Sequence, residues 1–367
     1  MYRCPITTME TTQKPKKFRR IGVLTSGGDA PGMNAAIRAV TRTAIDNGVE
    51  VMGIFDGYQG LIDDNIKPLN SRDVSNIITR GGTILYSARC LAFKEEAGMQ
   101  QAIQTCEKHQ IDGIVAIGGD GTFRGATDLS ARGVATIGIP GTIDNDITAS
   151  DYTIGFDTAM NCIIDFTDRL RDTCESHLRC SVVEVMGNHA GWLSLEAGIA
   201  VGASAIMVNE LPFDEEACMQ TLISQKESGK HSFIVMIAEG NGDYGEQLTK
   251  RIQERTGIES KFARLGHVQR GGSPTLRDRL IASEMGSDAV KLMLQGKSDL
   301  VMCYQKGHVV PVEIAYSQTL DRMYKHKLTQ EQIDAIDPAQ RAEMEAYCAQ
   351  RLSYIKQLYQ MANELAQ

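Results

Sequence analysis

Short β-branched segments alternate with helical stretches along most of this chain, and glycine-rich loops separate them. The first such segment is Arg20–Thr25, a glycine-rich loop covers 26–32, and helical spacing follows from Met33 to Asn47. Further strands are expected at 49–55, 111–117, 134–139, 181–185, 205–208 and 232–238. Alternation of this kind is typical of a parallel sheet covered by helices. The sequence therefore predicts an α/β fold with two doubly wound lobes, and a cleft between two lobes is the default position of a ligand.

The composition limits the classes of partner. The chain has 367 residues, of which 42% are hydrophobic, and this is enough for two ordinary domains. The formal net charge of -8 argues against nucleic acid or an anionic membrane as the main partner. The sequence contains no apolar run long enough to span a membrane. Nine scattered cysteines without a Cys-x-x-Cys pair indicate free thiols in a reducing compartment, so we expect a cytoplasmic protein.

The middle of the chain carries two acidic motifs, Ile117–Thr122 (IGGDGT) and Pro140–Asp146 (PGTIDND), each after a β-rich apolar run. Glycines let backbone N–H groups approach phosphate oxygens, and an aspartate beside them can hold Mg²⁺. Either motif alone is often only a tight turn or a solvated loop. Together, at the carboxyl ends of parallel strands, they indicate phosphoryl transfer to an alcohol, with one carboxylate for the metal and another for the proton.

Two further loops are candidates for anion binding. The loop 26–34 precedes a helix N-terminus, although it matches neither a Walker A loop nor the dinucleotide fingerprint. The loop 265–274 sets His267 and Arg270 beside two glycines, and the planar fork of arginine suits a phosphate monoester. Such a His-x-x-Arg pair is usually only surface, but beside a phosphoryl-transfer site we interpret it as a phosphate clamp for the acceptor. Glu239 ends a strand and is a candidate for bonding a sugar hydroxyl.

A last helix is predicted over 337–367. Asp337 is a suitable N-cap and Pro338 suits the first helical position. Apolar side chains then recur at helical spacing through Met344, Cys348, Leu352, Ile355, Tyr359, Ala362 and Ala366. An amphipathic helix docked on the body or on another subunit explains this pattern better than a function of its own.

Taken in order, these motifs resemble those of the phosphofructokinase family. The matching segments are Thr25–Arg38 (TSGGDAPGMNAAIR), Arg80–Arg89 (RGGT…SAR), GGDGT, PGTIDND, Ser181–Gly187 and Leu265–Pro274 (LGHVQRGGSP). GGDGT alone also occurs in NAD and diacylglycerol kinases, which lack PGTIDND and GHVQRGG. The resemblance covers Arg19 to about Ala335.

The resemblance implies two Rossmann-like lobes around an active-site cleft. ATP would bind mainly to a lobe formed by 19–155 and 268–318, and fructose 6-phosphate mainly to a lobe formed by 156–267 and 319–336. A flexible tail at 1–18 and the C-terminal helix at 337–367 would lie outside these lobes.

Roles for individual residues also follow from the resemblance, in a transfer from MgATP to the 1-hydroxyl of fructose 6-phosphate. Asp144 would be the base, positioned by Thr142, while Gly28 and Arg89 would steady the transferring group. Mg²⁺ would be held by Asp120 and Asp146. The nucleotide would be lined by Gly28, Tyr58, Arg89, Lys94, Gly119, Asp120, Gly121 and Thr122. The sugar phosphate would be held by Thr142, Asp144, Asp146, Met186, Gly187, Glu239, His267 and Arg270, together with Arg179 and Lys261 of a neighbouring subunit in a homotetramer.

The chain departs from the family pattern at several positions. Lys261 stands where arginine is usual, and Asn188 replaces an arginine that often follows Met-Gly. Bacterial relatives bind ADP or phosphoenolpyruvate in a basic pocket between subunits, which this chain matches at Arg38, Arg42, Arg171 and Lys230. The same pocket usually has an arginine, a glutamate and a lysine where this chain has Ser71, Ser204 and Ser228, although Arg72 is one position from the first. We therefore expect weak or altered control by these two metabolites.

Two other functions remain open on the sequence alone. One is the pyrophosphate-dependent form of the same family, in which the position of Gly121 is usually aspartate and that of Gly141 is usually lysine. The other is a catalytically silent sugar-phosphate sensor with two α/β lobes. A sensor needs no ordered carboxylate set, yet Asp120, Asp144 and Asp146 are all present.

Overall fold

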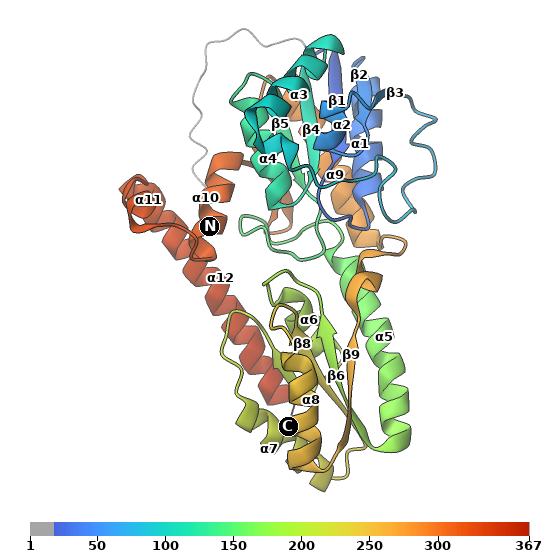
Figure 1. The fold of residues 1–367 in the computed structure, drawn as a ribbon, viewed down its shortest axis with the longest axis vertical. Coiled ribbons are helices and arrows are strands. Elements are labelled where there is room, and N and C mark those ends of the chain that lie inside the picture. The colour runs from blue at the N-terminus through green and yellow to red at the C-terminus, as the bar shows by residue number, and fades with distance from the viewer. Residues whose placement is uncertain (1–17, 367) are drawn as a thin grey trace.

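The computed structural model describes residues 18–366 and consists of two α/β lobes, each built on its own sheet (Figure 1). The sheet of the upper lobe has the strand order β11 (His308–Glu313), β10 (Leu300–Gln305), β5 (Ala135–Pro140), β4 (Gly113–Gly118), β1 (Arg20–Thr25), β2 (Glu50–Ile54) and β3 (Ile66–Leu69). The sheet of the lower lobe has the order β7 (Ala205–Met207), β8 (Ser232–Ala238), β6 (Arg179–Val185) and β9 (Glu259–Arg264). The predicted α/β fold with two lobes is confirmed.

The central strands of both sheets run parallel, so their carboxyl ends meet at one edge of each sheet. The central strands β4, β6 and β8 are almost wholly buried, since helices cover both faces. Strands β3, β9, β10 and β11 were not predicted. The two edge strands of the upper sheet, β3 and β11, pair antiparallel with β2 and β10. Each edge strand is partly exposed and contains a proline, Pro68 or Pro311, which is tolerated at a sheet edge.

Twelve α-helices cover the sheets and connect the lobes in the described part of the chain. They are α1 (Met33–Asp46), α2 (Tyr58–Ile62), α3 (Glu96–Lys108), α4 (Asp120–Ser130), α5 (Phe156–His177), α6 (Trp192–Ala200), α7 (Glu215–Glu227), α8 (Tyr244–Thr256), α9 (Leu276–Leu294), α10 (Ile314–Tyr324), α11 (Gln330–Asp334) and α12 (Pro338–Leu365). Two 3₁₀ turns, η1 (Ala92–Lys94) and η2 (Gly266–Arg270), complete the set. None of these helices is both long and apolar enough to cross a membrane.

The chain passes from the upper to the lower lobe at the start of α5, where a buried carboxylate fixes the backbone. Asp278, at the start of α9, accepts hydrogen bonds from the Tyr152 hydroxyl at 2.5 Å and from the Gly155 N–H at 2.7 Å. It also accepts bonds from the N–H and hydroxyl of Thr158, at 2.9 and 2.5 Å. Because four donors converge on one buried carboxylate, the crossing point is held in a single geometry.

The C-terminal helix α12 confirms the predicted N-terminus, since the Asp337 carboxylate accepts from the N–H groups of Ala339 and Gln340 and Pro338 occupies the first turn. The helix extends along the molecule from α10 of the upper lobe to α6 and β7 of the lower lobe (Figure 1). Of its apolar residues, Met344, Ile355 and Ala362 are buried. The predicted tail at 1–18 lies outside the described residues except for Phe18, which is buried in the core.

Candidate active site

A cleft of about 1810 Å³ lies where the carboxyl ends of both sheets face each other. The loops after β1, β4 and β5 line it from the upper lobe, and the loops after β6, β7 and β8 line it from the lower lobe. Residues of α10, the following segment 325–328 and α12 close a further side. The cleft is therefore bounded by both lobes and by the C-terminal helix.

Most of the predicted site residues line this cleft. They are Gly28, Tyr58, Arg89, Lys94, Gly119, Asp120, Gly121, Thr122, Thr142, Asp144, Asp146, Glu239 and Arg270. The predicted sugar-phosphate residues that do not line it are Arg179, Met186, Gly187, Lys261 and His267.

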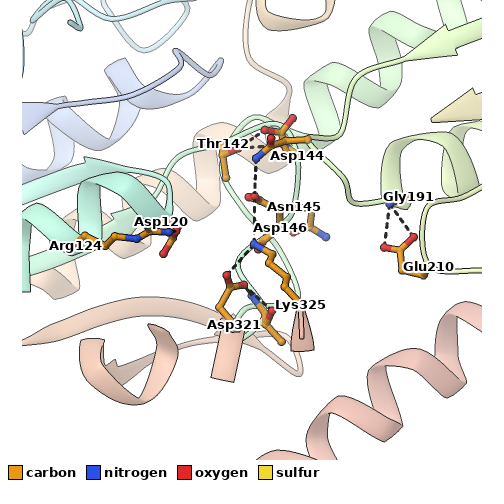
Figure 2. A network of polar contacts seen from close by, with 12 residues as sticks. Asp120, Arg124, Thr142, Asp144, Asn145, Asp146, Gly191, Glu210, Asp321 and Lys325 are labelled. Carbon is orange, nitrogen blue, oxygen red and sulfur yellow. Dashed lines mark hydrogen bonds and ion pairs between the residues drawn. The ribbon is translucent and has the colours of Figure 1, made fainter. Parts of the chain in front are cut away.

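Asp144 and Thr142 lie together in the loop after β5 (Figure 2). The Thr142 hydroxyl donates to Oδ2 of Asp144 at 3.3 Å, and the same hydroxyl accepts from the Asp144 N–H at 3.2 Å. The other carboxylate oxygen, Oδ1, is buried and has no hydrogen-bond partner among residues 18–366. A buried acceptor without a partner is costly, so this oxygen is the one available to a ligand hydroxyl.

Burial raises the pKa of Asp144 to about 6, and the neighbouring charge of Asp146 adds to this increase. The guanidinium of Arg270 opposes it, with Nη2 of Arg270 4.0 Å from Oδ2 of Asp144. A carboxylate with a pKa this close to neutrality is a better proton acceptor than an ordinary aspartate and is still ionised at pH 7.

Asp146 is almost fully buried, and a small polar network compensates its charge (Figure 2). Its Oδ2 lies 3.5 Å from Nζ of Lys325 and accepts from Nδ2 of Asn188 at 3.2 Å. Lys325 also pairs with Asp321 at 2.8 Å. Burial raises the pKa of Asp146, and Lys325 partly offsets this effect. Asn188 thus contacts the acidic loop directly.

Asp120 begins helix α4, directly after Gly119. Its carboxylate pairs with Arg124 one turn along the same helix and faces the cleft. The charge of Asp120 also contributes to the raised pKa of Asp146, so the two carboxylates lie close enough to interact. Tyr58 is buried and donates to the carbonyl of Thr122 at 2.5 Å, and this bond holds the start of α4. The ring of Tyr58 stacks on that of Phe93.

Arg270 reaches the first glycine-rich loop from η2. Its guanidinium donates to the carbonyl of Asp29 at 3.3 Å, and a β-carbon added at Gly28 would lie only 2.4 Å from Nη1. Glycine at this position therefore allows the close approach of arginine. The loops after β1 and β9, which belong to different lobes, meet at this contact.

The carboxylate of Glu239, predicted to bond a sugar hydroxyl, is held by the loop after β6. Its Oε1 accepts from the N–H groups of Gly187 and Asn188 at 3.2 and 3.0 Å. Arg179 and Lys261 lie on adjacent strands, and both pair with Glu259, at 2.9 and 3.1 Å. Neither residue lines the cleft of its own chain, since Arg179 begins β6 and the cleft lies at the carboxyl ends of the strands.

Four residues that contact the site were not among the predicted ones. Gln269 is fully buried and accepts from the Met186 N–H at 3.2 Å. Asp321, Lys325 and Arg351 come from the C-terminal part of the chain and contact the loop 145–150. Gln269 lies inside the 265–274 motif, where only His267 and Arg270 were selected, whereas no local motif marks Asp321, Lys325 and Arg351, whose partners are far away in the sequence.

A family model described as Phosphofructokinase matches residues 20–293, which is most of the chain. The chain belongs to the phosphofructokinase family. Three relatives share about half of its residues, and each carries the name ATP-dependent 6-phosphofructokinase. The protein from Clostridium novyi is 51% identical over 311 residues, or 85% of this chain and 97% of the relative. The protein from Shouchella clausii is 50% identical over 321 residues, or 86% of this chain and 99% of the relative. The one from Clostridium perfringens, named ATP-dependent 6-phosphofructokinase 1, is 49% identical over 311 residues, or 85% of this chain and 97% of the relative.

Solved phosphofructokinases share this fold. The enzyme from Saccharomyces cerevisiae superposes with a TM-score of 0.82 at 29% identity, covering 94% of this chain and 50% of the yeast chain. The Pichia pastoris phosphofructokinase in the T-state has a TM-score of 0.79 at 32% identity, covering 96% of this chain and 39% of that chain. A pyrophosphate-dependent phosphofructokinase from Marinobacter aquaeolei, at 21% identity, has a TM-score of 0.73 over 81% of this chain and 83% of its own. This last similarity shows the fold alone.

The raised pKa of Asp144 predicts the acid limb of the pH profile. A base must be ionised to accept a proton, so kcat/KM should fall about tenfold per pH unit once the pH drops below about 6. The phosphate groups of the substrates also titrate near this pH. The residual activity of an Asp144→Asn variant serves as the control. Its pH profile should still show the ionisation of the substrate phosphates but should lose the inflection that Asp144 causes. An unchanged acid limb in this variant would exclude Asp144 as the titrating group.

Proposed function

We propose that the chain transfers the terminal phosphoryl group of ATP to the 1-hydroxyl of fructose 6-phosphate, giving fructose 1,6-bisphosphate and ADP. The observation that carries the proposal is the buried, unpartnered Oδ1 of Asp144 in a cleft between two parallel-sheet edges. The names of relatives at about 50% identity support the same reaction.

Gly121 and Gly141 stand at the positions that distinguish ATP-dependent from pyrophosphate-dependent relatives. Both glycines support ATP as the donor. A β-carbon added at Gly121 meets nothing within 4 Å, so this position leaves open space beside the start of α4. A β-carbon at Gly141 would lie 3.1 Å from Ile117 and 3.2 Å from Met33. The lysine usual in pyrophosphate-dependent relatives would therefore be crowded here, whereas the open side of Gly121 leaves room for a nucleotide.

Asp144 acts as the general base in this proposal. The sugar hydroxyl attacks the terminal phosphorus, its proton passes to Oδ1 of Asp144, and the bond to ADP breaks. Thr142 orients the carboxylate through its bond to Oδ2. Arg270, proposed to hold the sugar phosphate, also favours the ionised form of this carboxylate. Gly28 and Arg89 line the same cleft, and we propose that they steady the transferring group. Positive charge there stabilises the phosphoryl oxygens during the transfer.

The carboxylates of Asp120 and Asp146 fit a magnesium ion. Both face the cleft and lie close enough to raise the pKa of Asp146. The described residues hold no cluster of three or more His, Cys, Asp or Glu side chains suited to a metal. Two carboxylates suffice, since Mg²⁺ usually takes one or two and completes its shell with waters and substrate phosphates. When bound, the ion would neutralise charge on those phosphates.

The arrangement also supports the predicted division of the substrates between the lobes. Tyr58, Lys94, Gly119, Gly121 and Thr122 line the upper side of the cleft, where we place the nucleotide. We assign 19–155 and 268–318 to the ATP-binding lobe and 156–267 to the sugar-phosphate lobe. The segment 319–336, predicted to belong to the sugar-phosphate lobe, begins inside α10, which packs on α4, β10 and β11 of the upper lobe, so we leave it out of that lobe. Eight described cysteines are free thiols, which supports a cytoplasmic enzyme.

Arg179 and Lys261 are proposed to serve the sugar phosphate of a neighbouring subunit. Both are basic, and they share one acidic partner, Glu259, on the outer part of the lower lobe. Basic residues that do not line the cleft of their own chain are suited to a site shared across an interface, as in the expected homotetramer. Met186, Gly187 and His267 complete the proposed sugar-phosphate set, although they do not line the cleft of the isolated chain.

The direct test of the function compares the two donors. Purified protein is assayed with fructose 6-phosphate and Mg²⁺, once with ATP and once with pyrophosphate, and fructose 1,6-bisphosphate is measured. We expect turnover with ATP and little with pyrophosphate. Equal or faster turnover with pyrophosphate would refute the assigned donor, and no turnover with either would favour a silent sensor.

The role of Asp144 predicts the effect of removing its negative charge. Asp144→Asn keeps the size of the side chain but cannot take the proton, so kcat should fall by roughly 10²–10⁴ with a smaller change in KM. Asp165→Asn, at an exposed position of α5, serves as a control and should leave kcat unchanged. A kcat within tenfold of wild type in Asp144→Asn would contradict the assignment.

The predicted effector residues lie in two groups, Arg38 and Arg42 on α1 and Arg171 and Lys230 in the lower lobe. We propose that the second group is a poor anion site because its lysine is already bonded. Nζ of Lys230 donates to Ser204 at 3.3 Å and to Oε1 of Gln225 at 3.1 Å. Burial and the charge of Arg171 lower the pKa of Lys230.

This proposal predicts weak control by small anionic metabolites. The fructose 6-phosphate saturation curve is measured with and without millimolar ADP or phosphoenolpyruvate. Half-saturation should shift little, because each missing charged hydrogen bond removes about 1.5–3 kcal/mol. A large and reversible shift with either compound would show that the substituted pocket still works.

A further inference from the structure

Arg351 is a cleft residue from outside the matched family segment, in the middle of α12. The N-terminal half of α12 contributes Met344 to the core of the upper lobe, and the C-terminal half packs on α6 and β7 of the lower lobe. Arg351 is positioned where the helix passes the cleft. Its side chain thus reaches the acidic loop from an element that contacts both lobes (Figure 1).

The guanidinium of Arg351 donates to three backbone carbonyls of the loop after β5. Nη2 donates to Asn145 at 3.2 Å, and Nη1 donates to Thr148 at 3.3 Å and to Ser150 at 3.1 Å. The guanidinium also lies over the ring of Trp192 at the start of α6, 4.8 Å from its centroid, and 6.0 Å from the ring centroid of Tyr324. A planar side chain held between an aromatic ring and three acceptors has little freedom of its own.

The loop bonded by Arg351 needs such support because its backbone is unusual at Asn145. Asn145 has a φ of +50°, in the left-handed region that, apart from glycine, asparagine and aspartate tolerate best. Asn145 separates Asp144 from Asp146, so its conformation decides how the two carboxylates are directed. Its Oδ1 is buried without a partner, and its Nδ2 makes only a long bond of 3.3 Å to the carbonyl of Asp151. The side-chain contacts of Asn145 are therefore weak, and the bond from Arg351 to its carbonyl adds a remote one.

We propose that Arg351 is a positioning residue for phosphoryl transfer, which holds the backbone at Asn145 so that Asp144 and Asp146 keep their orientation. The inference rests on the proposed roles of these two aspartates. Arg351 itself contacts no reacting atom. Glu196 and Glu210 also interact electrostatically with Arg351, so a purely electrostatic role is the alternative to be excluded.

The test uses the full-length protein and two arginine variants on the same helix. Arg351→Ala removes the three hydrogen bonds to the loop. Arg341→Ala removes a half-buried arginine whose ion pairs in the described part of the chain are with Asp334 and Glu345. In Arg351→Ala, hydrogen exchange of the amides at 145–152 should accelerate and kcat should fall roughly 10- to 100-fold. KM for both substrates should change less than about threefold, because the ligand contacts of both lobes remain. Arg341→Ala should match wild type in all these measurements.

The Arg351→Lys variant distinguishes a positioning role of Arg351 from a purely electrostatic one. It also keeps the proposal testable if the alanine variant does not fold. Lysine keeps the stem and the positive charge but cannot span three carbonyls or stack as a plane. We expect the fast exchange and the low kcat to persist at least in part. Full recovery of both by lysine would overturn the proposal in favour of charge balance with Glu196 and Glu210. Unchanged exchange at 145–152 in Arg351→Ala, or fast exchange with normal kcat, would overturn it as well.

These outcomes are distinguishable from failure of the proposed function. If Asp144 is not the base, Asp144→Asn keeps its activity whatever Arg351 does. If only the positioning role is wrong, Asp144→Asn is inactive while Arg351→Ala turns over normally. The exchange measurement reports on the loop without substrate, so it does not depend on the assigned reaction.

Discussion

The structure depends on the burial of two carboxylates, Asp144 and Asp146, within three residues of one loop. An ionised carboxylate is costly to bury unless partners compensate its charge. Asp146 has Lys325 and Asn188, whereas Asp144 has only Thr142 and a distant Arg270. The uneven compensation leaves Asp144 with a raised pKa and a free acceptor oxygen, which are the properties of a general base.

Both lobes and the C-terminal segment are needed to hold this loop. Strand β5 places it at the carboxyl edge of the upper sheet, and the loop after β6 contacts it through Asn188. The C-terminal segment adds Lys325 and Arg351, which bond its backbone carbonyls. The acidic loop is therefore a joint product of three parts of the chain, and small changes in any of them can reach the reacting groups.

The sequence predicted the parts of the fold and site that depend on local pattern. The strand at 232–238 and the start of α12 at Pro338 were placed correctly, because β-branched runs and N-caps are local signals. The family of the chain and the acidic loop were also predicted, since their motifs are contiguous. The edge strands β3 and β11 were missed because they are half exposed and interrupted by proline. Arg351 and Lys325 could not be predicted, since each pairs with a loop far away along the chain.

A titration of the Asp144 carboxyl itself tests most directly whether this residue has the raised pKa of a general base. Infrared difference spectra between the wild-type protein and Asp144→Asn, recorded across pH, isolate the carboxyl band of this one residue. We predict that the band of the protonated carboxyl disappears as the pH rises, with a midpoint near pH 6, because burial and Asp146 disfavour the ionised form. A midpoint near the ordinary aspartate value of about 3.9 would contradict it.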